Sequence, residues 1–540
     1  MSYSDYSDSG FFVMSSFSSK ESGVSFSGIA YVGDCIVINQ PGMDEYLKDH
    51  DIDISSLSEG RFSVAVNDGN TIVAKSDNMG QDAMFYYYKN GIWGLSNSLY
   101  LLAKHLCENR VSLSVNYETL ASMMVSHSSA QQLISNQTPF NEIRVLPAEK
   151  FIRVSHGINP NRVDIVEWTD LSNDGDVSED EYRAILSNFV VESSSRAIAL
   201  LDSFSGHEKV DISGGVDSRV VLSLIAASGR DLSGINFCSN PNAGDDFRVA
   251  SNLMDKVGGT IKNRPFNYEK SSISDIYNLW KVGNLGVYQS LEMPLSTMPQ
   301  HAVHFHGACG ECFRDFYINR GSMMSKVIAS KYDEKWSFPA VGKIADAFSE
   351  MNVDIESKDS SMIHYRNFRS RFHFGRSSFR SLSSVLATPL ASHDLLRATR
   401  HLSTSQREDN QLAMDIMLAS GMGLERMEYD KPEKTFPDRC FESSMFKGSS
   451  LDASRYVREI KVYKGVSGVK GNGDEDNRSI KDLISSDLKK FSGSVISSGL
   501  YAEEEISSIM ENVDQSSSLR QISRDAVRII YAGEVLEMCV

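Results

Sequence analysis

A turn rich in glycine and serine, residues 213–218 with the sequence SGGVDS, constrains the fold of this chain more than any other stretch. Residues 209–212, just before it, have the apolar character of a short buried strand. After it, apolar residues recur at helical spacing and a glycine stands where the helix would end (Val220, Val221, Leu224, Ile225; Gly229). A strand, a tight turn and a helix in this order direct backbone N–H groups and a helix N-terminus toward an anion such as phosphate.

The turn differs from the phosphate-binding loop of kinases and GTPases, because no G-x-x-x-x-G-K-[ST] occurs in the chain. It resembles instead the fingerprint of the nucleotide α-hydrolases, which release pyrophosphate. The resemblance implies that the loop cradles the pyrophosphate of ATP and that its aspartate binds Mg²⁺ (Ser213, Gly214, Gly215, Val216 and Ser218; Asp217). The alternative is a tight strand-to-helix turn without a ligand.

The length and charge of the chain limit its class. At 540 residues it is long enough for two or more domains. With 54 Lys and Arg against 71 Asp and Glu, and no basic stripe, nucleic acid is not expected as the main partner. The acidic first residues do not suggest a signal peptide, no apolar run approaches the roughly 20 residues that span a bilayer, and seven unevenly spaced cysteines do not suggest a disulfide framework. We therefore expect a cytoplasmic protein without a membrane partner.

Residues 1–175 are expected to form a β-rich domain. Short strand-like runs alternate with two hairpin turns, over residues 67–70 and 90–91. The expected strands cover residues 11–17, 28–32, 61–66, 70–75, 83–88 and 92–96, and a helix follows from about Ser98.

Residues 176–540 are expected to form a second domain, in which strands alternate with helices from about residue 180. This alternation predicts a doubly wound parallel sheet with a ligand at the carboxyl ends of its strands. The expected helices cover residues 181–200 and 246–257, and the expected strands cover 209–212, 234–239, 260–266 and 302–306. Beyond about residue 340 we expect mostly helix, a mobile loop over residues 465–478 and two amphipathic helices at the end.

Both halves resemble the asparagine synthetase family, which joins a class II glutamine amidotransferase-like domain to an ATP-pyrophosphatase-type synthetase domain. Residues 245–250 resemble the family's D-x-x-x-A helix beside the adenosine site, and residues 60–68 and 77–98 resemble the amidotransferase scaffold. The resemblance implies a degenerate N-terminal αββα sandwich of the Ntn-hydrolase type, then the ATP-pyrophosphatase domain with helical C-terminal additions. It also implies further ATP contacts from Ser239, Asp246 and Gly307.

The N-terminal half departs from the glutaminases of this class, which use an N-terminal cysteine whose own amino group is the base. Position 2 is Ser2, the first expected strand begins only near Phe11, and Cys35 is internal. Ser2 is the alternative N-terminal nucleophile. We expect a structural domain without glutaminase activity, as in the β-lactam and carbapenam synthetases and the lasso peptide cyclases.

Residues 307–317 resemble the family's second metal-binding turn. Glu311 falls where the family has an aspartate, which implies that Asp217 and Glu311 together hold magnesium. Ala308 falls where the family has a carboxylate or tyrosine near the reacting amine, so that group is missing at this position. The pair Cys309 and Cys312 is attributed to the glycine turn rather than to a zinc or redox site.

Further candidates come from the second half. Four arginines lie between residues 364 and 376, either on a helix face paired with local carboxylates or as a site for phosphate or a carboxylate. The possible substrate contacts are Arg314, Arg369 and Arg371. Family members also carry a late lysine that stabilises charge during amide formation, for which Lys434 is the first candidate and Lys431 the second.

These observations predict an ATP-dependent amide ligase. A substrate carboxylate would attack the α-phosphate of Mg-ATP, and an amine or ammonia would then displace AMP from the acyl-adenylate. The alternatives are asparagine synthetase proper, a peptide macrolactam cyclase, an enzyme that amidates a sugar acid, and a non-catalytic ATP-binding scaffold. The expected partners are a small-molecule or peptide carboxylate and an amine; a homodimer or a biosynthetic partner protein is also compatible with the sequence.

Overall fold

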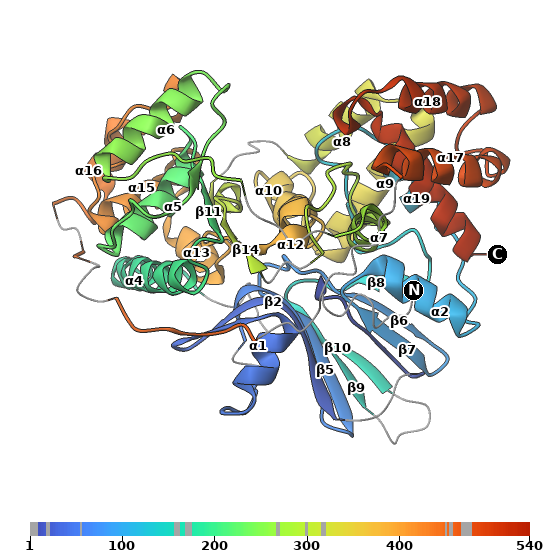
Figure 1. The fold of residues 1–540 in the computed structure, drawn as a ribbon, viewed down its shortest axis with the longest axis horizontal. Helices are drawn as coiled ribbons and strands as arrows, with labels where there is room; N and C mark the ends of the chain where they lie inside the picture. The colour runs from blue at the N-terminus through green and yellow to red at the C-terminus, as the bar shows by residue number, and fades with distance from the viewer. Residues whose placement is uncertain are drawn as a thin grey trace.

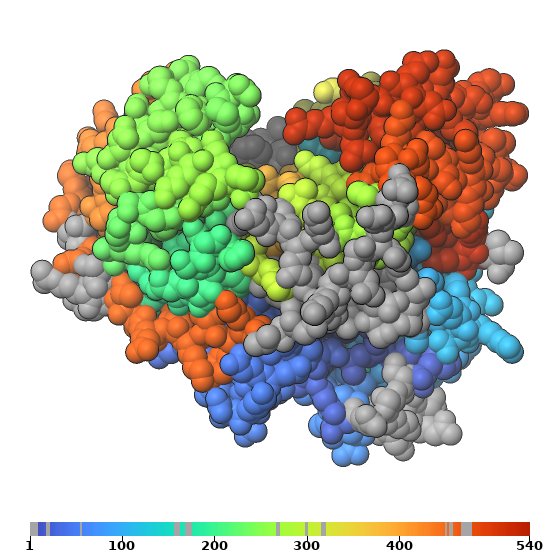
Figure 2. All heavy atoms as spheres, viewed as in Figure 1, coloured from blue at the N-terminus to red at the C-terminus, as the bar shows by residue number. Residues whose placement is uncertain are grey.

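The computed structural model describes residues 9–17, 22–54, 57–155, 162–167, 175–265, 271–297, 301–314, 320–448, 451–452, 457–465 and 478–539. Within these ranges the chain is a mixed α/β protein with two largely antiparallel sheets and one parallel sheet (Figure 1). In the space-filling view the N-terminal half (blue) forms the base, and the parallel-sheet region (green) and the C-terminal helices (red) stand above it as separate lobes (Figure 2).

The N-terminal half forms both antiparallel sheets, apart from one edge strand, β15, that comes from the C-terminal part of the chain. The larger has the order β10-β9-β5-β4-β2-β3-β15 and the smaller the order β1-β7-β6-β8. The strands of the larger sheet are β2 (Gly23–Val32), β3 (Cys35–Ile38), β4 (Glu59–Asn67), β5 (Thr71–Ser76), β9 (Lys150–Ser155), β10 (Arg162–Glu167) and β15 (Lys461–Tyr463). Those of the smaller are β1 (Val13–Ser15), β6 (Phe85–Lys89), β7 (Ile92–Ser96) and β8 (Ile143–Val145).

The two sheets face each other across an apolar core, and each has a helix on its outer face. On β4, Ala65 packs against the smaller sheet, whereas Phe62 and Val64 pack against α1 (Asn39–Tyr46). On the smaller sheet, Trp93 and Leu95 face the larger sheet. The outward side chains of β6, Phe85 and Tyr87, pack with α2 (Leu99–Glu108). Strand alternation therefore produces four layers, helix, sheet, sheet and helix.

The predicted hairpins are confirmed. Strands β4 and β5 pair antiparallel across a turn in which Gly69 has φ +92°. Strands β6 and β7 are joined by Asn90 and Gly91, whose φ angles are +54° and +78°. Positive φ at both central residues defines the type I′ turn that matches the twist of paired strands. Ser98 caps α2 by accepting a hydrogen bond from Leu101 N.

The parallel sheet has the order β12-β11-β13-β14. Its strands are β11 (Glu208–Asp211), β12 (Phe237–Cys238), β13 (Val303–Phe305) and β14 (Val385–Ala387). Alternate residues Val210, Val303 and Phe305 belong to an apolar core with α4 (Glu179–Ser203), α5 (Val216–Ala227), α13 (His393–Ala398) and α15 (Gln411–Ser420). The other face carries the polar side chains of Lys209, Asp211 and His304. The predicted parallel sheet is thus confirmed.

One predicted strand is wrong. Among the described residues of 260–266, Ile261 forms only an isolated bridge to Phe237, and Phe266 lies outside the described ranges. Asn263 has φ +49°, which no extended strand accommodates. The side chain of Asn236 instead accepts from Arg264 N and donates to Arg264 O, both at 3.0 Å.

The C-terminal part of the chain returns to the N-terminal half twice. Strand β15 pairs in parallel with β3, and Tyr463 is 1% exposed among the residues of α1. Three helices, rather than the two expected, then follow: α17 (Ile480–Ser497), α18 (Glu503–Gln515) and α19 (Arg524–Met538). They pack on α2 and on α7 (Ile273–Asn284), as Figure 1 shows. The expected loop over 465–478 lies almost wholly outside the described residues.

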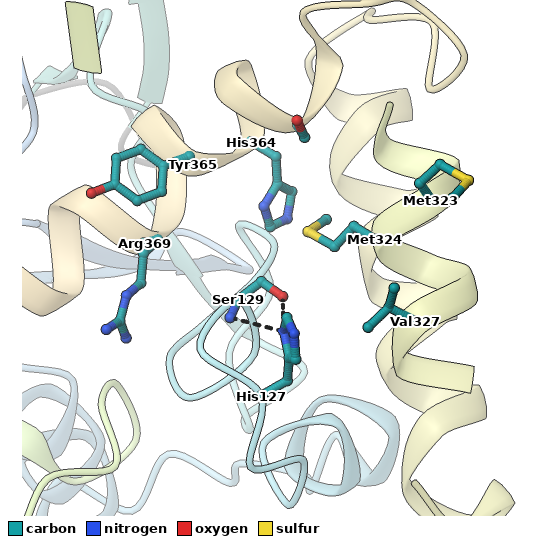
Figure 3. Close-up of a pocket in the computed structure, with 9 residues that line it drawn as sticks. His127, Ser129, Met323, Met324, Val327, His364, Tyr365 and Arg369 are labelled. Atoms are coloured by element: carbon teal, nitrogen blue, oxygen red, sulfur yellow. Dashed lines mark hydrogen bonds between the residues drawn. The ribbon is translucent and has the colours of Figure 1, made fainter. Parts of the chain in front are cut away.

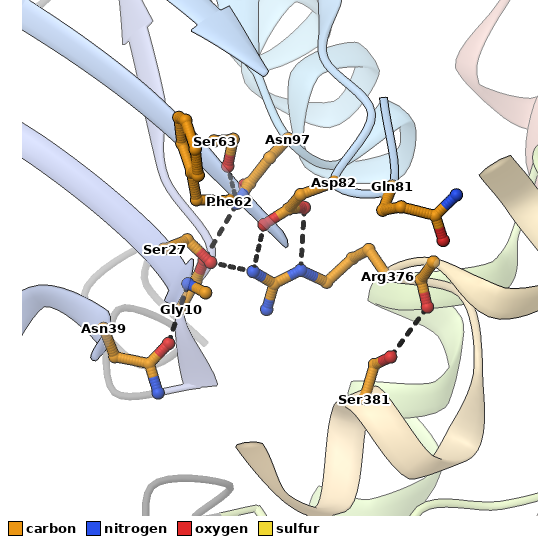
Figure 4. A network of polar contacts seen from close by, with 12 residues as sticks. Gly10, Ser27, Asn39, Phe62, Ser63, Gln81, Asp82, Asn97, Arg376 and Ser381 are labelled. Carbon is orange, nitrogen blue, oxygen red and sulfur yellow. Dashed lines mark hydrogen bonds and ion pairs between the residues drawn. The ribbon is translucent and has the colours of Figure 1, made fainter. Parts of the chain in front are cut away.

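A buried ion pair also joins the halves (Figure 4). Arg376 donates from Nε to Asp82 Oδ1 at 2.9 Å and pairs with Oδ2 and with Ser27 Oγ through Nη2. The side chains are 6% and 0% exposed. Arg371, five residues earlier, donates to the carbonyl oxygens of Gly80 and Leu146, both at 3.0 Å. These two arginines therefore hold the halves together.

Among the described residues, α4 has the length and hydropathy of a membrane-spanning helix, with a mean hydropathy of 1.2 over its most apolar window. Half of that window is buried inside the protein. Its apolar residues, among them Tyr182, Leu186 and Val190, belong to the core beneath the parallel sheet.

Candidate functional site

The predicted turn lies between β11 and α5 and is held by its own serines. Ser213 N donates to Ser218 Oγ at 3.1 Å, and the two hydroxyl oxygens are 2.8 Å apart. Gly215 N donates to Ser213 Oγ at 3.2 Å, and Gly214 N donates to Asp246 Oδ1 at 2.8 Å. The first N–H groups of a helix have no partner within it, so the start of α5 supplies further donors at this point.

A cavity of about 550 Å³ opens at the carboxyl ends of β11, β12 and β13. It brings together most of the predicted nucleotide-binding residues (Ser213, Asp217, Ser218, Ser239, Asp246, Gly307 and Glu311). Ala308 also lines it. Of the remaining loop residues, Val216 is buried in the core, and Gly214 and Gly215 approach Asp430 and Lys434.

The two predicted metal ligands approach each other because the intervening turn is rich in glycine. A Cβ on Gly307 would lie 2.8 Å from the Asp217 carbonyl carbon, and one on Gly310 would overlap the Asp217 carboxylate. Glu311 Oε2 is buried and has no hydrogen-bond partner among the described residues. Burial, and then the charge of Asp217, raises the pKa of Glu311 to about 7.

The guanidinium of Arg314 pairs with both carboxylate oxygens of Asp217. Its Nη1 and Nη2 donate to Oδ1 and Oδ2 at 2.8 and 3.0 Å. Within the described ranges, no group of three His, Cys, Asp or Glu residues could bind a metal by itself. Two carboxylates with an orphaned oxygen still suit Mg²⁺, which is commonly bound by one or two carboxylates plus substrate phosphates.

The two candidate lysines differ in position. Lys434 ends η6 (Pro432–Lys434) and pairs with both carboxylate oxygens of Asp430, at 2.7 and 2.9 Å. Its Nζ lies 3.6 Å from where a Cβ on Gly215 would be, so it is beside the turn. Lys431 is exposed to solvent, and the structure does not bring it to the cavity.

Arg219, which sequence reasoning missed, fixes the segment that carries Lys434. It is fully buried on α5 and donates to the carbonyl oxygens of Leu424, Met427 and Glu428. Its guanidinium also stacks on Tyr429, 3.6 Å from the ring centre. The one sign of this role in the sequence is that an arginine directly follows the motif of residues 213–218.

A cluster of polar side chains around Asp211 also lines the cavity. The sequence did not indicate that these side chains lie together. Asp211 Oδ2 lies 2.8 Å from His304 Nε2 and 3.8 Å from Arg380 Nε, and Oδ1 lies 3.2 Å from Lys209 Nζ. Burial alone would raise the pKa of Asp211, but the neighbouring His304, Lys209 and His306 lower it well below its usual range. Burial, and then Arg380, lowers the pKa of His306 to about 3, so this ring is neutral.

The arginine cluster does not act as one surface. Arg366 Nε donates to Cys312 O at 2.7 Å, and Arg369 Nη1 donates to Gln132 Oε1 at 3.0 Å. Arg371 and Arg376 are buried at the contact between the halves, so Arg371 does not reach the cavity. Cys309 and Cys312 both lie near Ser370 Oγ, at 3.7 and 3.3 Å, and are fully buried.

A scan against protein-family models finds no match to this chain, and a search of curated proteins finds none either.

Proposed function

We propose that this protein is an ATP-dependent amide ligase of the asparagine synthetase type. The observation that carries the proposal is the turn of residues 213–218, which opens with Asp217 and Glu311 into one cavity at the ends of parallel strands. Ligands of open parallel sheets bind at this edge. The cavity volume, about 550 Å³, lies within the range of roughly 300–1,000 Å³ usual for small-molecule sites.

Different residues of the cavity would bind different parts of the nucleotide. The turn and the start of α5 would receive the pyrophosphate through N–H and hydroxyl groups. Ser239 Oγ, which is buried and has no hydrogen-bond partner among the described residues, would bind on the adenosine side. Asp246 holds Gly214 in place at 2.8 Å and so keeps the turn open toward the phosphates.

Asp217 and Glu311 would hold Mg²⁺, which when bound offsets the charge that develops on the leaving pyrophosphate. Lys434 lies beside the turn, next to Gly215, and would add a second positive group there. In the first step a carboxylate oxygen bonds to the α-phosphorus and the bond to pyrophosphate breaks. In the second an amine nitrogen bonds to the acyl carbon, the bond to AMP breaks and the amine loses a proton.

The N-terminal half serves as a scaffold in this proposal, so the amine does not come from glutamine. Gly10, shortly before β1, is packed into the buried network of Arg376 and Asp82, where Asn97 Nδ2 donates to Gly10 O at 2.9 Å (Figure 4). The four layers of this half support the proposal of an amidotransferase-like, Ntn-type domain. The expected acceptor is a small-molecule or peptide carboxylate in the cytoplasm.

One observation favours a second candidate, a protein that binds ATP without chemistry. Arg314 neutralises Asp217, and a guanidinium in this place could replace the metal in holding phosphates. The ligase requires this ion pair to open when Mg-ATP binds.

Calorimetry with α,β-methylene-ATP and then pyrophosphate release from ATP would test the proposal. We expect Mg²⁺-dependent binding that Asp217→Asn and Glu311→Gln each weaken at least tenfold. Asp245→Asn, which removes an exposed carboxylate paired with Arg248, should leave affinity unchanged. Pyrophosphate release should require a carboxylic acid and not glutamine. Binding without Mg²⁺ dependence and without release would favour the second candidate, and no binding would overturn both.

A further inference from the structure

A second cavity, of about 220 Å³, lies between α8 (Gly321–Lys331), the loop at His127 and the contiguous helical segments α10 (Ser360–His364) and η4 (Tyr365–Arg369). Met323, Met324 and Val327 of α8 form one side. Tyr365 and Arg369 lie on the opposite side (Figure 3). An apolar cavity of roughly 150 Å³ is enough to hold benzene, so this one accommodates an aromatic ring or a branched chain.

The charge of this cavity selects an anion. Among the described residues no Asp or Glu lines it. Burial lowers the pKa of His364 to about 4 and also lowers the pKa of His127, so both rings are neutral at pH 7. Arg369 is therefore the one charged side chain among the lining residues that the structure describes. It donates to the neutral Gln132 at 3.0 Å and lies 5.8 Å from the ring centre of Tyr288, and it forms no ion pair with a carboxylate in the described ranges.

The cavity adjoins the nucleotide site through η4, a π-helical segment. Such π-turns are rare and often occur at functional sites. Arg366 of η4 donates from Nε to Cys312 O at 2.7 Å, directly beside Glu311. Ser370, the next residue after η4, lies 3.3 Å from Cys312 Sγ. Arg369 is also close enough to Glu311 for its charge to favour the ionised carboxylate.

We propose that this cavity binds the apolar side chain of the carboxylic acid that the enzyme activates, with Arg369 holding its carboxylate at the end nearest the nucleotide site. The inference rests on the ligase activity proposed above and assigns its substrate class: acids with an aromatic or branched aliphatic group. Aspartate and sugar acids would place polar groups against Met323, Met324 and Val327, side chains that offer no good hydrogen-bond partner, and this costs free energy.

Direct binding and turnover would be measured separately, on the full chain. The probe for binding is 3-phenylpropanoate, and 3-phenylpropanamide is the uncharged control. Saturation-transfer NMR and calorimetry would measure the binding of each compound without ATP. Val327→Trp should fill the cavity and Arg369→Gln should remove its charge, and each should weaken acid binding at least tenfold. Lys326→Gln removes an exposed positive charge from the same helix and should change nothing. Thermal unfolding of each variant establishes that it is folded.

Turnover would be followed as pyrophosphate release with 3-phenylpropanoate, 4-methylpentanoate, acetate and aspartate. The apolar acids should exceed acetate and aspartate at least tenfold in kcat/KM, and Val327→Trp should abolish that preference. Acid binding unaffected by both variants, or turnover of aspartate that Val327→Trp leaves unchanged, would overturn the cavity assignment while the ligase proposal stands. Acid binding that depends on Arg369, without any pyrophosphate release, would support the cavity and overturn the ligase.

Discussion

Arg314 and Asp217 form a two-point ion pair, with N–O distances of 2.8 and 3.0 Å, beside the orphaned Glu311. Both side chains are mostly buried, at 16% and 20% exposure. The guanidinium therefore balances a carboxylate that would otherwise face a second carboxylate across a glycine turn. A metal ion at Asp217 and Glu311 would compete with Arg314 for the same oxygens.

Arg314→Gln should make the stability of the protein depend on Mg²⁺. Loss of the charged hydrogen bonds should lower the free energy of unfolding by about 1.5–3 kcal/mol. Mg²⁺ without nucleotide should then raise the melting temperature of the variant, because two carboxylates face each other without a counter-charge, and should hardly affect the wild type. The double variant Arg314→Gln with Asp217→Asn is the control and should not respond. Equal responses of wild type and Arg314→Gln would contradict the competition.

Nucleotide binding should weaken as the pH falls through 7. Burial and Asp217 raise the pKa of Glu311 to about 7, and only its carboxylate binds Mg²⁺ well. Glu311 should be about one-tenth ionised at pH 6 and about nine-tenths at pH 8, so affinity for Mg-α,β-methylene-ATP should be roughly tenfold weaker at pH 6. Calorimetry at both pH values would measure this. Glu311→Gln should bind weakly with only the pH dependence of the nucleotide, and a slope equal to that of the wild type would assign the titration elsewhere.

The same pKa shift affects stability. A folded pKa near 7, against the ordinary 4.5, means that the folded state keeps a proton that the unfolded chain loses between these values. Glu311 therefore contributes stability below about pH 4.5 that is lost as the pH rises through 7. Urea unfolding at pH 5 and pH 8 should show a smaller decrease for Glu311→Gln than for the wild type.

Arg376→Met should strongly destabilise the contact between the halves. It would leave Asp82, which is 0% exposed, without its counter-charge, at a cost of about 3–5 kcal/mol. Lys358→Met, which removes an exposed ion pair with Glu408, should cost less than about 1 kcal/mol. Denaturant unfolding followed by both fluorescence and circular dichroism would measure this. A cost for Arg376→Met no greater than that of Lys358→Met would show that the pair does not join the halves.

Tyr463→Ala should destabilise the N-terminal sandwich from a position far along the chain. Tyr463 packs on Tyr46 with ring centres 5.3 Å apart, and its hydroxyl lies 3.1 Å from His50 Nε2. Removing such a buried ring should cost about 3–5 kcal/mol. Glu459→Ala, at an exposed residue just before β15, is the matched control. Hydrogen exchange of β3 should increase in Tyr463→Ala alone, and unchanged protection there would contradict the role of β15.

Lys434→Ala should slow catalysis without loss of nucleotide binding. Removal of one positive group from a developing negative charge typically lowers kcat by about 10²–10³. Affinity for Mg-α,β-methylene-ATP should change less than about threefold, because Lys434 is already paired with Asp430. Lys431→Ala, an exposed neighbour, should have wild-type activity in the same pyrophosphate-release experiment. Equal losses of activity in both variants would show that Lys434 does not have this role in catalysis.

Local patterns in the sequence predicted the elements that short-range chemistry controls. The hairpin turns at residues 67–70 and 90–91 follow from residues that tolerate positive φ, and α5 follows from its apolar spacing and Gly229. Strand β15 could not be predicted in this way, because its partner β3 lies more than 400 residues earlier. The prediction of a strand over residues 260–266 was wrong because Asn236 and Asn263 form side-chain contacts that override strand propensity.

By itself the sequence determined the turn of residues 213–218, because a tight strand-to-helix connection depends on neighbouring residues alone. The resemblance of residues 213–218 and 307–317 to a known family also named Asp217 and Glu311 as candidate partners, and both residues follow parallel strands whose ends meet at one edge. Only the tertiary structure decided that Arg314 pairs with Asp217, that Arg371 and Arg376 join the halves rather than bind substrate, and that an apolar cavity lies behind η4. Long side chains such as arginine reach several partners, and burial and packing between distant segments select among them.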